Sequence, residues 1–317
     1  MTTLIAYSGN SDYCYPNSLR MTLQAAGMDA RAQPEVGFLE CLTTLPFGKM
    51  FLDLEEGPII LFSSSEVDPD QGLTLAFKAL GWTCLEQRGQ EPDEALAALR
   101  QAVRQAPVLV GPIDLGYLRY NPFHNSLAGG DHFVVVLAVQ DETILLHDPW
   151  KFPCVSLPLS AFLQAWRAER IEYLQAPYTF RSDFRKAEQI SRQETIERTL
   201  TAVQAHLKAE KTGPVLYSNA HALRMLAAGL RTPEPPTSLT ASLTTFVFPL
   251  GARRAIDAAA FLREAGLLEA ARDMEQQALL CGQAQYPAVC KQYGEVARLA
   301  DQLADVEQRL TESLLAL

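Results

Sequence analysis

A histidine and an aspartate lie at positions where two neighbouring strands are expected to bring them together. Two apolar runs, 132–139 and 143–148, are separated by a short polar break, and Pro149 would end the second run. This pattern predicts a β-hairpin with His132 at the start of one strand and Asp148 at the end of the next. Because antiparallel strands place these two ends side by side, the imidazole and the carboxylate can form a hydrogen bond. A histidine that is oriented by a carboxylate is one half of a catalytic triad.

Cys14 is the candidate for the nucleophile that such a pair would serve. The sequence from Cys14 to Gly27 predicts a helix, since Pro16 fits a first turn and Leu19 and Leu23 repeat at helical spacing. Cys14 then lies at or just before the helix N-terminus, where unpaired N–H groups and the helix dipole stabilise a thiolate. A thiolate is the form of cysteine that attacks a carbonyl carbon. A buried cysteine in the capping region is the alternative, and the predicted histidine–aspartate pair favours the catalytic interpretation.

An aromatic segment before the hairpin is a candidate wall of the site. Residues 114–125 combine aromatic side chains with turn-forming residues. Tyr117, Tyr120 and His124 are therefore candidate substrate-binding residues, although packing of a long connection explains the aromatic residues equally well. His147 directly precedes the aspartate of the hairpin. Neighbouring strand residues point to opposite faces, so we expect His147 to be a packed or surface histidine.

The composition argues against some classes of partner. The chain has 317 residues, a formal net charge of −10 and no concentrated block of Lys and Arg, which is not typical of a nucleic-acid or anionic-membrane binder. No run approaches the roughly 20 apolar residues of a membrane span, and the N-terminus does not resemble a signal peptide. We therefore expect a cytoplasmic protein with a small-molecule or protein partner.

The cysteines do not indicate a metal site. All six are scattered, without a CxxC pair or a cluster with histidine at metal-ligand spacing. Cys41, Cys84 and Cys154 have apolar neighbours in the sequence, so we expect each to be buried. A disulfide between Cys281 and Cys290 is conceivable but not expected in a reducing compartment. We expect neither a metal nor another cofactor.

The order of the predicted elements indicates an α+β domain followed by a helical domain. Short strands and helices follow one another up to about residue 180, from a first strand at 4–7 to a last strand at 171–174. From about residue 184, Leu, Ala and charged residues repeat with a period near 3.6, which predicts helices. The predicted domains are residues 1–180 and residues 181–317. The helical domain could dock a carrier protein, cover the site or form a homo-oligomer.

The chain order cysteine, histidine, aspartate is that of papain-type enzymes. The spacing from Cys14 to Leu19, Asp12 just upstream, His132 and Asp148-Pro149 resemble the leader peptidases of bacteriocin exporters, which are papain-fold cysteine peptidases. A closer resemblance is to the butirosin biosynthesis protein H N-terminal family. It covers roughly residues 1–180 and rests on short motifs: Asn17-Ser18-Leu19-Arg20, Asp68-Pro69-Asp70, His132 to Val139, His147-Asp148-Pro149-Trp150 and Phe152-Pro153.

The resemblance implies a papain-like fold, with a nucleophile helix against an antiparallel sheet, and gives each candidate residue a role. Cys14 would be the nucleophile, His132 the general base and acid, and Asp148 the residue that orients the imidazole. The characterised relative in that family moves an aminoacyl group from a carrier-protein thioester to an aminoglycoside amine. The implied partners are therefore an acyl thioester donor, such as a carrier protein, and a small amine acceptor in secondary metabolism.

One position departs from the papain pattern and bears on the reaction. Papain-like peptidases carry a glutamine six residues before the cysteine, which donates to the oxyanion, and here that position is Ser8. Either Ser8 or Asn10 supplies the donor, or the backbone N–H of Cys14 carries more of it. Loss of one donor lowers the rate roughly 10²–10³-fold, which favours an activated thioester over an amide as acyl donor. We therefore expect a cysteine-dependent acyltransferase; the alternatives are a cysteine peptidase or amide hydrolase, and a non-catalytic binding protein on the same fold.

Overall fold

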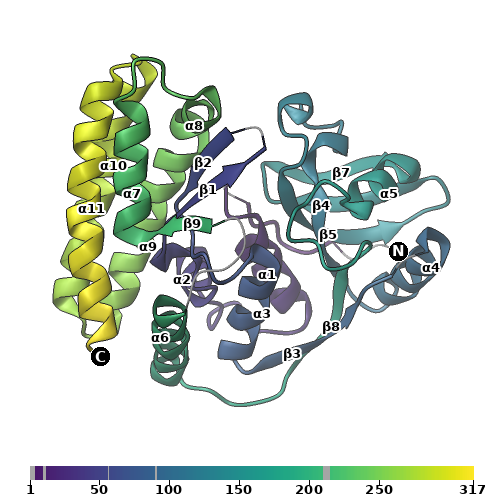
Figure 1. The fold of residues 1–317 in the computed structure, drawn as a ribbon. Helices are drawn as coiled ribbons and strands as arrows, with labels where there is room; N and C mark the ends of the chain where they lie inside the picture. The colour runs from purple at the N-terminus through teal and green to yellow at the C-terminus, as the bar shows by residue number, and fades with distance from the viewer. Residues whose placement is uncertain (1–3, 10–11, 56, 90, 210–214) are drawn as a thin grey trace. The chain divides into compact units, whose positions relative to one another are not determined.

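The chain folds into two compact units of helices and antiparallel sheets (Figure 1). Unit 1 consists of Met1–Val36 with Leu80–Gln189, and unit 2 of Gly37–Ala79 with Ile190–Leu317. The prediction of a mixed α and β protein with a helical C-terminal region is confirmed. The computed structural model describes residues 4–9, 12–55, 57–89, 91–209 and 215–317.

Unit 1 contains a six-stranded sheet in which every neighbouring pair of strands is antiparallel. The strand order is β3-β8-β4-β5-β6-β7, so the predicted hairpin, β5 with β6, lies inside the sheet. The short helical turns η2 (Leu115–Tyr117) and η3 (His124–Ser126) lie between β4 and β5. The strands are β3 Trp82–Gln87, β4 Val108–Asp114, β5 Asp131–Val139, β6 Thr143–Asp148, β7 Phe152–Pro158 and β8 Phe180–Lys186.

Helices cover both faces of this sheet. Val134 and Val136 of β5 belong to a core that includes side chains of α4 and α5, whereas Val135 packs with Met21 of α1. Because side chains alternate across a strand, α1 covers one face and α4 and α5 cover the other. Burial on both faces explains the nearly continuous apolar sequence of β5. The helices are α1 Cys14–Ala25, α4 Pro92–Val103 and α5 Leu159–Arg167.

Helix α1 begins at Cys14 and is closed by a glycine, as the sequence predicted. Pro16 lies in the first turn, where its missing N–H removes no helical hydrogen bond. At the other end Gly27 adopts φ 92°, and the N–H of Met28 donates to the carbonyl oxygen of Leu23 at 3.0 Å. Glycine adopts this left-handed conformation without a steric penalty, so the helix ends there.

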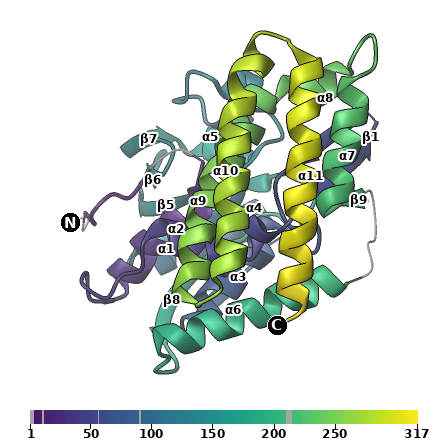
Figure 2. The ribbon, with the colours of Figure 1, turned by 90° about the vertical axis from the view of Figure 1, so that its left-hand side faces the viewer.

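Unit 2 combines a three-stranded antiparallel sheet with long C-terminal helices. The sheet has the order β2-β1-β9, with β1 Met50–Leu54, β2 Gly57–Leu61 and β9 Val215–Ser218. Helix α10 packs against both α9 and α11, and α11 also packs against α7 (Figure 2). The helices are α2 Val36–Leu42, η1 Leu45–Phe47, α3 Pro69–Ala79, α6 Arg192–Lys208, α7 Asn219–Leu230, α8 Thr237–Ala241, η4 Leu243–Val247, α9 Phe248–Glu264, α10 Leu268–Val289 and α11 Tyr293–Leu315.

The early segment 37–79 is part of the core of unit 2. Strand β1 pairs with β9 as well as with β2. Phe51, Ile60 and Phe62 lie in one buried cluster with side chains of α7, α10 and α11. The contacts therefore group the chain differently from the predicted domains 1–180 and 181–317. Local sequence patterns could not reveal this grouping, because the partners of β1 and β2 lie far along the chain.

Two buried ion pairs also join segment 37–79 to the C-terminal helices. Lys49 Nζ lies 2.9 Å from Glu307 Oε2, and both side chains are buried. Arg254 Nη2 lies 2.7 Å from Glu40 Oε1, again with both side chains buried. Breaking such a pair leaves an uncompensated charge in the interior, so these contacts fix which segments must pack together.

Two expected strands do not form. Residues 4–7 form no strand, and residues 171–174 form turns in which the N–H of Leu174 donates to the carbonyl of Ile171 at 3.1 Å. The last strand of the sheet is instead β8, which carries three basic residues and one aspartate. This charged sequence gives no apolar signal for a strand.

The cysteines are not joined in disulfides and differ in exposure. Cys41 and Cys281 are buried, Cys84 is half-buried, and Cys154 and Cys290 are exposed. The expectation of burial is therefore confirmed for Cys41, met only in part for Cys84, and wrong for Cys154, which lies on the outer strand β7 at φ 52°. Among the described helices, none is both long and apolar enough to cross a membrane.

Candidate active site

The structure brings Cys14, His132 and Asp148 together within unit 1. Cys14 is the first residue of α1, His132 the second of β5 and Asp148 the last of β6. The His132 Nε2 atom lies 2.6 Å from Asp148 Oδ1, and the Cys14 thiol lies close enough to the imidazole for each group to shift the pKa of the other. Because Nε2 is engaged by the carboxylate, Nδ1 is the ring nitrogen left for the thiol. All three side chains are buried, with residue exposures of 7%, 3% and 0%.

The hairpin register accounts for the contact between His132 and Asp148. In the β5–β6 ladder Val135 is paired with His147 and Val136 with Leu146. This antiparallel register places the start of β5 beside the end of β6, as the sequence predicted. The polar break closes by a hydrogen bond from the N–H of Gln140 to the Thr143 carbonyl, at 2.8 Å.

Two contacts hold the start of α1 against β5. The Ser18 hydroxyl donates to the carbonyl oxygen of Phe133 at 3.1 Å, and this bond is buried. The Tyr15 and Phe133 rings meet edge to face with centroids 5.9 Å apart. Since Ser18 and Tyr15 share the first turns of α1 with Cys14, these contacts keep the thiol beside His132.

The Asp148 carboxylate accepts hydrogen bonds from three groups. Oδ1 accepts from His132 and, at 2.7 Å, from the backbone N–H of Trp150, while Oδ2 accepts from the Tyr120 hydroxyl at 2.9 Å. Burial alone would raise the pKa of Asp148, but the charge of His132 and these hydrogen bonds lower it below its usual value. The carboxylate is therefore ionised at neutral pH.

The imidazole and the thiol influence one another. Burial alone would lower the pKa of His132, but the charges of Asp148 and Cys14, with their hydrogen bonds, raise it well above its usual value. Burial raises the pKa of the Cys14 thiol, against the opposing effect of His132. Burial thus outweighs the stabilisation of the thiolate by His132. The arrangement lets a proton move between sulfur and imidazole.

Of the two predicted oxyanion donors, the structure describes Ser8 but not Asn10. The Ser8 hydroxyl donates to Asn17 Oδ1 at 2.6 Å, so its only hydrogen is directed at Asn17. Asn10 lies outside the described residues. The backbone N–H of Cys14 is the first of α1 and has no partner within the helix, which makes it a donor for an oxyanion.

The predicted substrate-binding residues lie in the connection from β4 to β5. Tyr117 stacks under the Arg170 guanidinium, with a carbon-to-centroid distance of 4.7 Å. His124 Nδ1 lies 3.1 Å from the carbonyl oxygen of Gly116. Tyr120 differs from both, because its hydroxyl contacts Asp148 directly. The sequence analysis did not predict this contact, because no sequence pattern indicates that an aromatic residue in a loop contacts the end of a particular strand.

His147 is a packed histidine, as predicted. Its Nδ1 accepts the N–H of Cys154 at 3.0 Å, and its Nε2 donates to the carbonyl oxygen of Ile5 at 3.2 Å. Burial lowers the pKa of His147, so the ring is neutral. The hydrogen bond from Trp150 to Asp148 was also missed, although Asp-Pro followed by a third residue is a recognisable signal for a turn closed by the aspartate side chain.

The loop before Cys14 passes close to Tyr7 and Pro149 at Gly9. A Cβ atom at position 9 would lie 2.0 Å from the Tyr7 hydroxyl oxygen and 2.6 Å from the Pro149 carbonyl oxygen. The Tyr7 hydroxyl in turn donates to the backbone carbonyl of Asp148 at 2.9 Å. A residue with a Cβ atom would clash here. Glycine therefore lets this loop lie close to the end of β6.

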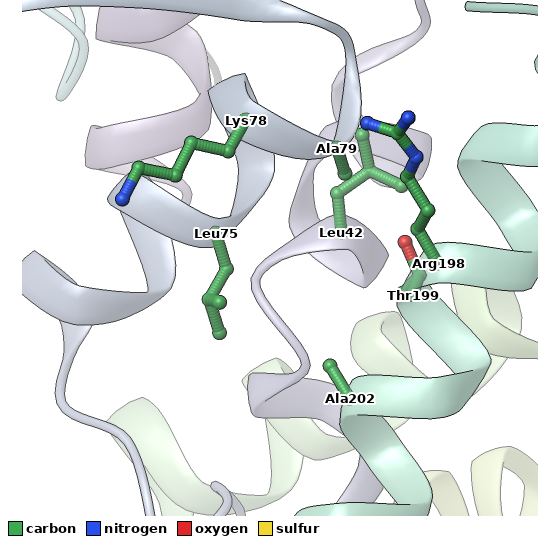
Figure 3. Close-up of a pocket in the computed structure, with 7 residues that line it drawn as sticks. All are labelled: Leu42, Leu75, Lys78, Ala79, Arg198, Thr199 and Ala202. Atoms are coloured by element: carbon green, nitrogen blue, oxygen red, sulfur yellow. The ribbon is translucent and has the colours of Figure 1, made fainter.

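Neither a metal cluster nor the pocket described below involves the Cys14, His132 and Asp148 site in the described part of the chain. In the ranges that the structure describes, no cluster of three His, Cys, Asp or Glu residues could hold a metal ion. A pocket of about 200 Å³, with mostly apolar lining, belongs to unit 2 and contains none of the candidate site residues; Figure 3 shows the residues that line it. Its lining residues are Leu42, Leu75, Lys78, Ala79, Arg198, Thr199 and Ala202.

Fold and site together define a class: a mixed α and β protein in which a cysteine at the N-terminus of a helix meets a histidine and an aspartate on an antiparallel sheet. The family model described as the YobF C-terminal domain matches residues 213–315. Over 315 residues the chain is 33% identical to the "Uncharacterized protein YobF" of Bacillus subtilis (strain 168), covering 98% of this chain and 99% of that protein. The chain therefore belongs to the YobF family.

Proposed function

We propose that this protein is a cysteine-dependent acyltransferase with a papain-like catalytic unit. Cys14 is the nucleophile, His132 the general base and acid, and Asp148 the residue that orients the imidazole. The observation that carries the proposal is the contact of the three side chains within unit 1. A nucleophile beside a base that is itself oriented by a third group is the arrangement that activates a thiol.

The first step transfers the acyl group to the protein. The Cys14 sulfur attacks the carbonyl carbon of an acyl thioester donor, and His132 takes the thiol proton. A bond forms between that carbon and the Cys14 sulfur, while the bond to the donor sulfur breaks. His132 gives its proton to the departing thiolate, which leaves as a free thiol.

The second step transfers the acyl group to an amine. A neutral amine attacks the Cys14 thioester, a carbon–nitrogen bond forms, and the carbon–sulfur bond to Cys14 breaks. His132 takes a proton from the amine and returns it to the sulfur, so the product is an amide and the thiol is regenerated. Asp148 stabilises the imidazolium in both steps because its ionised carboxylate accepts from Nε2.

The oxyanion donors support a thioester rather than an amide as the acyl donor. The Ser8 hydroxyl is committed to Asn17, which leaves the Cys14 backbone N–H as the described donor. A thioester is more reactive than an amide and needs less stabilisation of the oxyanion. The donor that we propose is an acyl or aminoacyl thioester on a carrier protein, and the acceptor is a small amine in a cytoplasmic secondary-metabolic reaction.

Acyl adduct formation on Cys14 tests this proposal. The protein is incubated with aminoacyl and short acyl thioesters of N-acetylcysteamine, and intact mass with peptide mapping locates the adduct. We expect one acyl group on Cys14, none in Cys14→Ser, and release of the adduct as an amide when small amines are added. The exposed Cys154 and Cys290 could react nonspecifically, so wild type and variant are compared in a Cys154→Ser, Cys290→Ser background.

The other outcomes of this experiment separate the alternatives. An adduct that is lost to water at the same rate with and without amines, together with peptide cleavage, would identify a hydrolase. Absence of any Cys14 adduct, with iodoacetamide also failing to alkylate Cys14 near neutral pH, would indicate a non-catalytic binding protein.

A further inference from the structure

The Tyr120 hydroxyl contacts the oxygen of Asp148 that does not touch His132. It donates to Oδ2 at 2.9 Å, whereas Oδ1 is occupied by the imidazole at 2.6 Å and the Trp150 N–H at 2.7 Å. Both carboxylate oxygens are therefore fixed. A carboxylate held at both oxygens cannot rotate without breaking a hydrogen bond.

The Tyr120 ring and hydroxyl are suited to this contact. The ring packs edge to face on Phe152 of β7, with centroids 5.4 Å apart. Burial and the adjacent Asp148 charge raise the pKa of Tyr120 well above its usual value, so the hydroxyl keeps its proton. At neutral pH it is a donor to the carboxylate.

The backbone that carries Tyr120 is closed at both ends by one buried carboxylate. Asp114 Oδ1 accepts from the N–H groups of Gly116 at 2.8 Å and Gly129 at 3.0 Å. Asp114 Oδ2 accepts from Arg170 Nε at 2.6 Å. The connection between β4 and β5 is thus held as a loop with fixed ends, which presents Tyr120 to Asp148.

We propose that Tyr120 is a positioning residue that acts through Asp148 on His132, rather than a substrate contact. This inference rests on the proposed function of Cys14, His132 and Asp148. The hydroxyl keeps the carboxylate in the orientation that holds Nε2, so that Nδ1 stays aligned with the thiol. A phenyl ring at this position would keep the packing on Phe152 and lose only the hydrogen bond.

The test compares Tyr120→Phe with Tyr178→Phe as a matched control, because Tyr178 is a buried tyrosine of the same unit whose ring packs edge to face on Trp166, with centroids 5.4 Å apart. For Tyr120→Phe we expect kcat for thioester transfer to fall about 10- to 100-fold, the usual effect of losing a hydrogen bond to a charged group, with KM within about twofold. The control should keep its kcat. Thermal melting of both variants checks that the fold is retained.

A second readout does not require acyl transfer. The rate of Cys14 alkylation by iodoacetamide is followed against pH in the Cys154→Ser, Cys290→Ser background. The Tyr120 hydrogen bond lowers the pKa of Asp148. Without it the carboxylate takes up a proton at a higher pH and stops supporting His132. The acid limb of the alkylation profile should therefore move to higher pH. The Tyr178→Phe profile should match that of the parent.

The outcomes distinguish the two levels of the proposal. A raised KM with an unchanged kcat and an unchanged alkylation profile would make Tyr120 a substrate contact and overturn the inference. An unchanged kcat, KM and profile would reduce it to a packing residue and overturn it equally. If His132→Gln leaves the alkylation profile of Cys14 as it is in the parent, the proposed function itself fails instead.

Discussion

Asp148 is the residue whose charge determines the protonation of the site. It is fully buried and ionised, and it raises the pKa of His132 against the effect of burial. The imidazole ring is consequently held in one orientation, with Nε2 towards the carboxylate and Nδ1 towards the thiol. A neutral side chain of the same shape at position 148 would remove the negative charge beside His132 while the imidazole stays buried.

Asp148→Asn is therefore predicted to lower the pKa of His132 below its usual value, because burial is then no longer opposed by a nearby negative charge. The measurement is a pH titration of ¹³C-labelled histidine followed by NMR, in a Cys14→Ser background that removes the coupled thiol. His132→Gln assigns the signal. His147 is the internal control, because it is bound to backbone groups and should not move. An unchanged His132 titration would refute the role given to Asp148.

At this scale the sequence predicted the positions of the reactive groups better than their hydrogen bonds. His132 and Asp148 could be paired because strand ends follow from an apolar pattern. The bond from Ser8 to Asn17 could not be predicted, because competition for a hydroxyl proton depends on which acceptor the fold places nearest. The same holds for Tyr120, whose partner Asp148 lies at the end of β6, 28 residues along the chain.

The elements that position these residues are the hairpin of β5 with β6 and helix α1. Both were predictable because each has a regular apolar pattern and a clear stop: Pro149 follows β6, and Gly27 closes α1. Strand β8 was missed because its charged sequence has no such pattern. The pairing of β1 with β9 was missed because no local signal connects two distant strands.

Gly27→Ala tests the helix stop of α1. At φ 92° an alanine is strained, and we expect a loss of about 1 kcal/mol in the free energy of unfolding. Gly282→Ala is the matched control: Gly282 lies inside α10, and a Cβ atom there meets no neighbour within 4 Å. Alanine should stabilise that helix by up to about 1 kcal/mol. Chemical denaturation measures both, and equal signs for the two variants would contradict this account.

At the scale of the whole molecule, the chain passes between the two units three times, after residues 36, 79 and 189. Unit 2 therefore needs a segment that is remote in sequence from its helices. The match to the YobF C-terminal domain begins at residue 213, and that fragment contains β9 but not its partner β1. The domain boundary predicted from composition, after residue 180, marks where the chain becomes mainly helical. It does not mark where the contacts divide the chain into units.

A fragment of residues 181–317 is accordingly predicted to lack the cooperative thermal unfolding of the full chain. It loses Phe51, Ile60 and Phe62 from its core, and removal of one such side chain costs about 2–5 kcal/mol, against a total stability of about 5–15 kcal/mol. It also leaves Glu307 and Arg254 without their buried partners. Circular dichroism melting and gel filtration provide the measurement, and co-expression of 37–79 is the rescue control. A monomeric fragment that melts like the intact protein would show that segment 37–79 is dispensable.

The interleaving of the two units also sets an order of events on the ribosome. Phe51, Ile60 and Phe62 leave the exit tunnel before unit 1 is finished, while the helices that bury them are translated last. Unit 1 can complete its sheet as soon as β8 has emerged, but the early strands of unit 2 must wait, with apolar side chains uncovered, until α7, α10 and α11 exist. During synthesis, segment 37–79 is therefore the part of the nascent chain most in need of protection from aggregation.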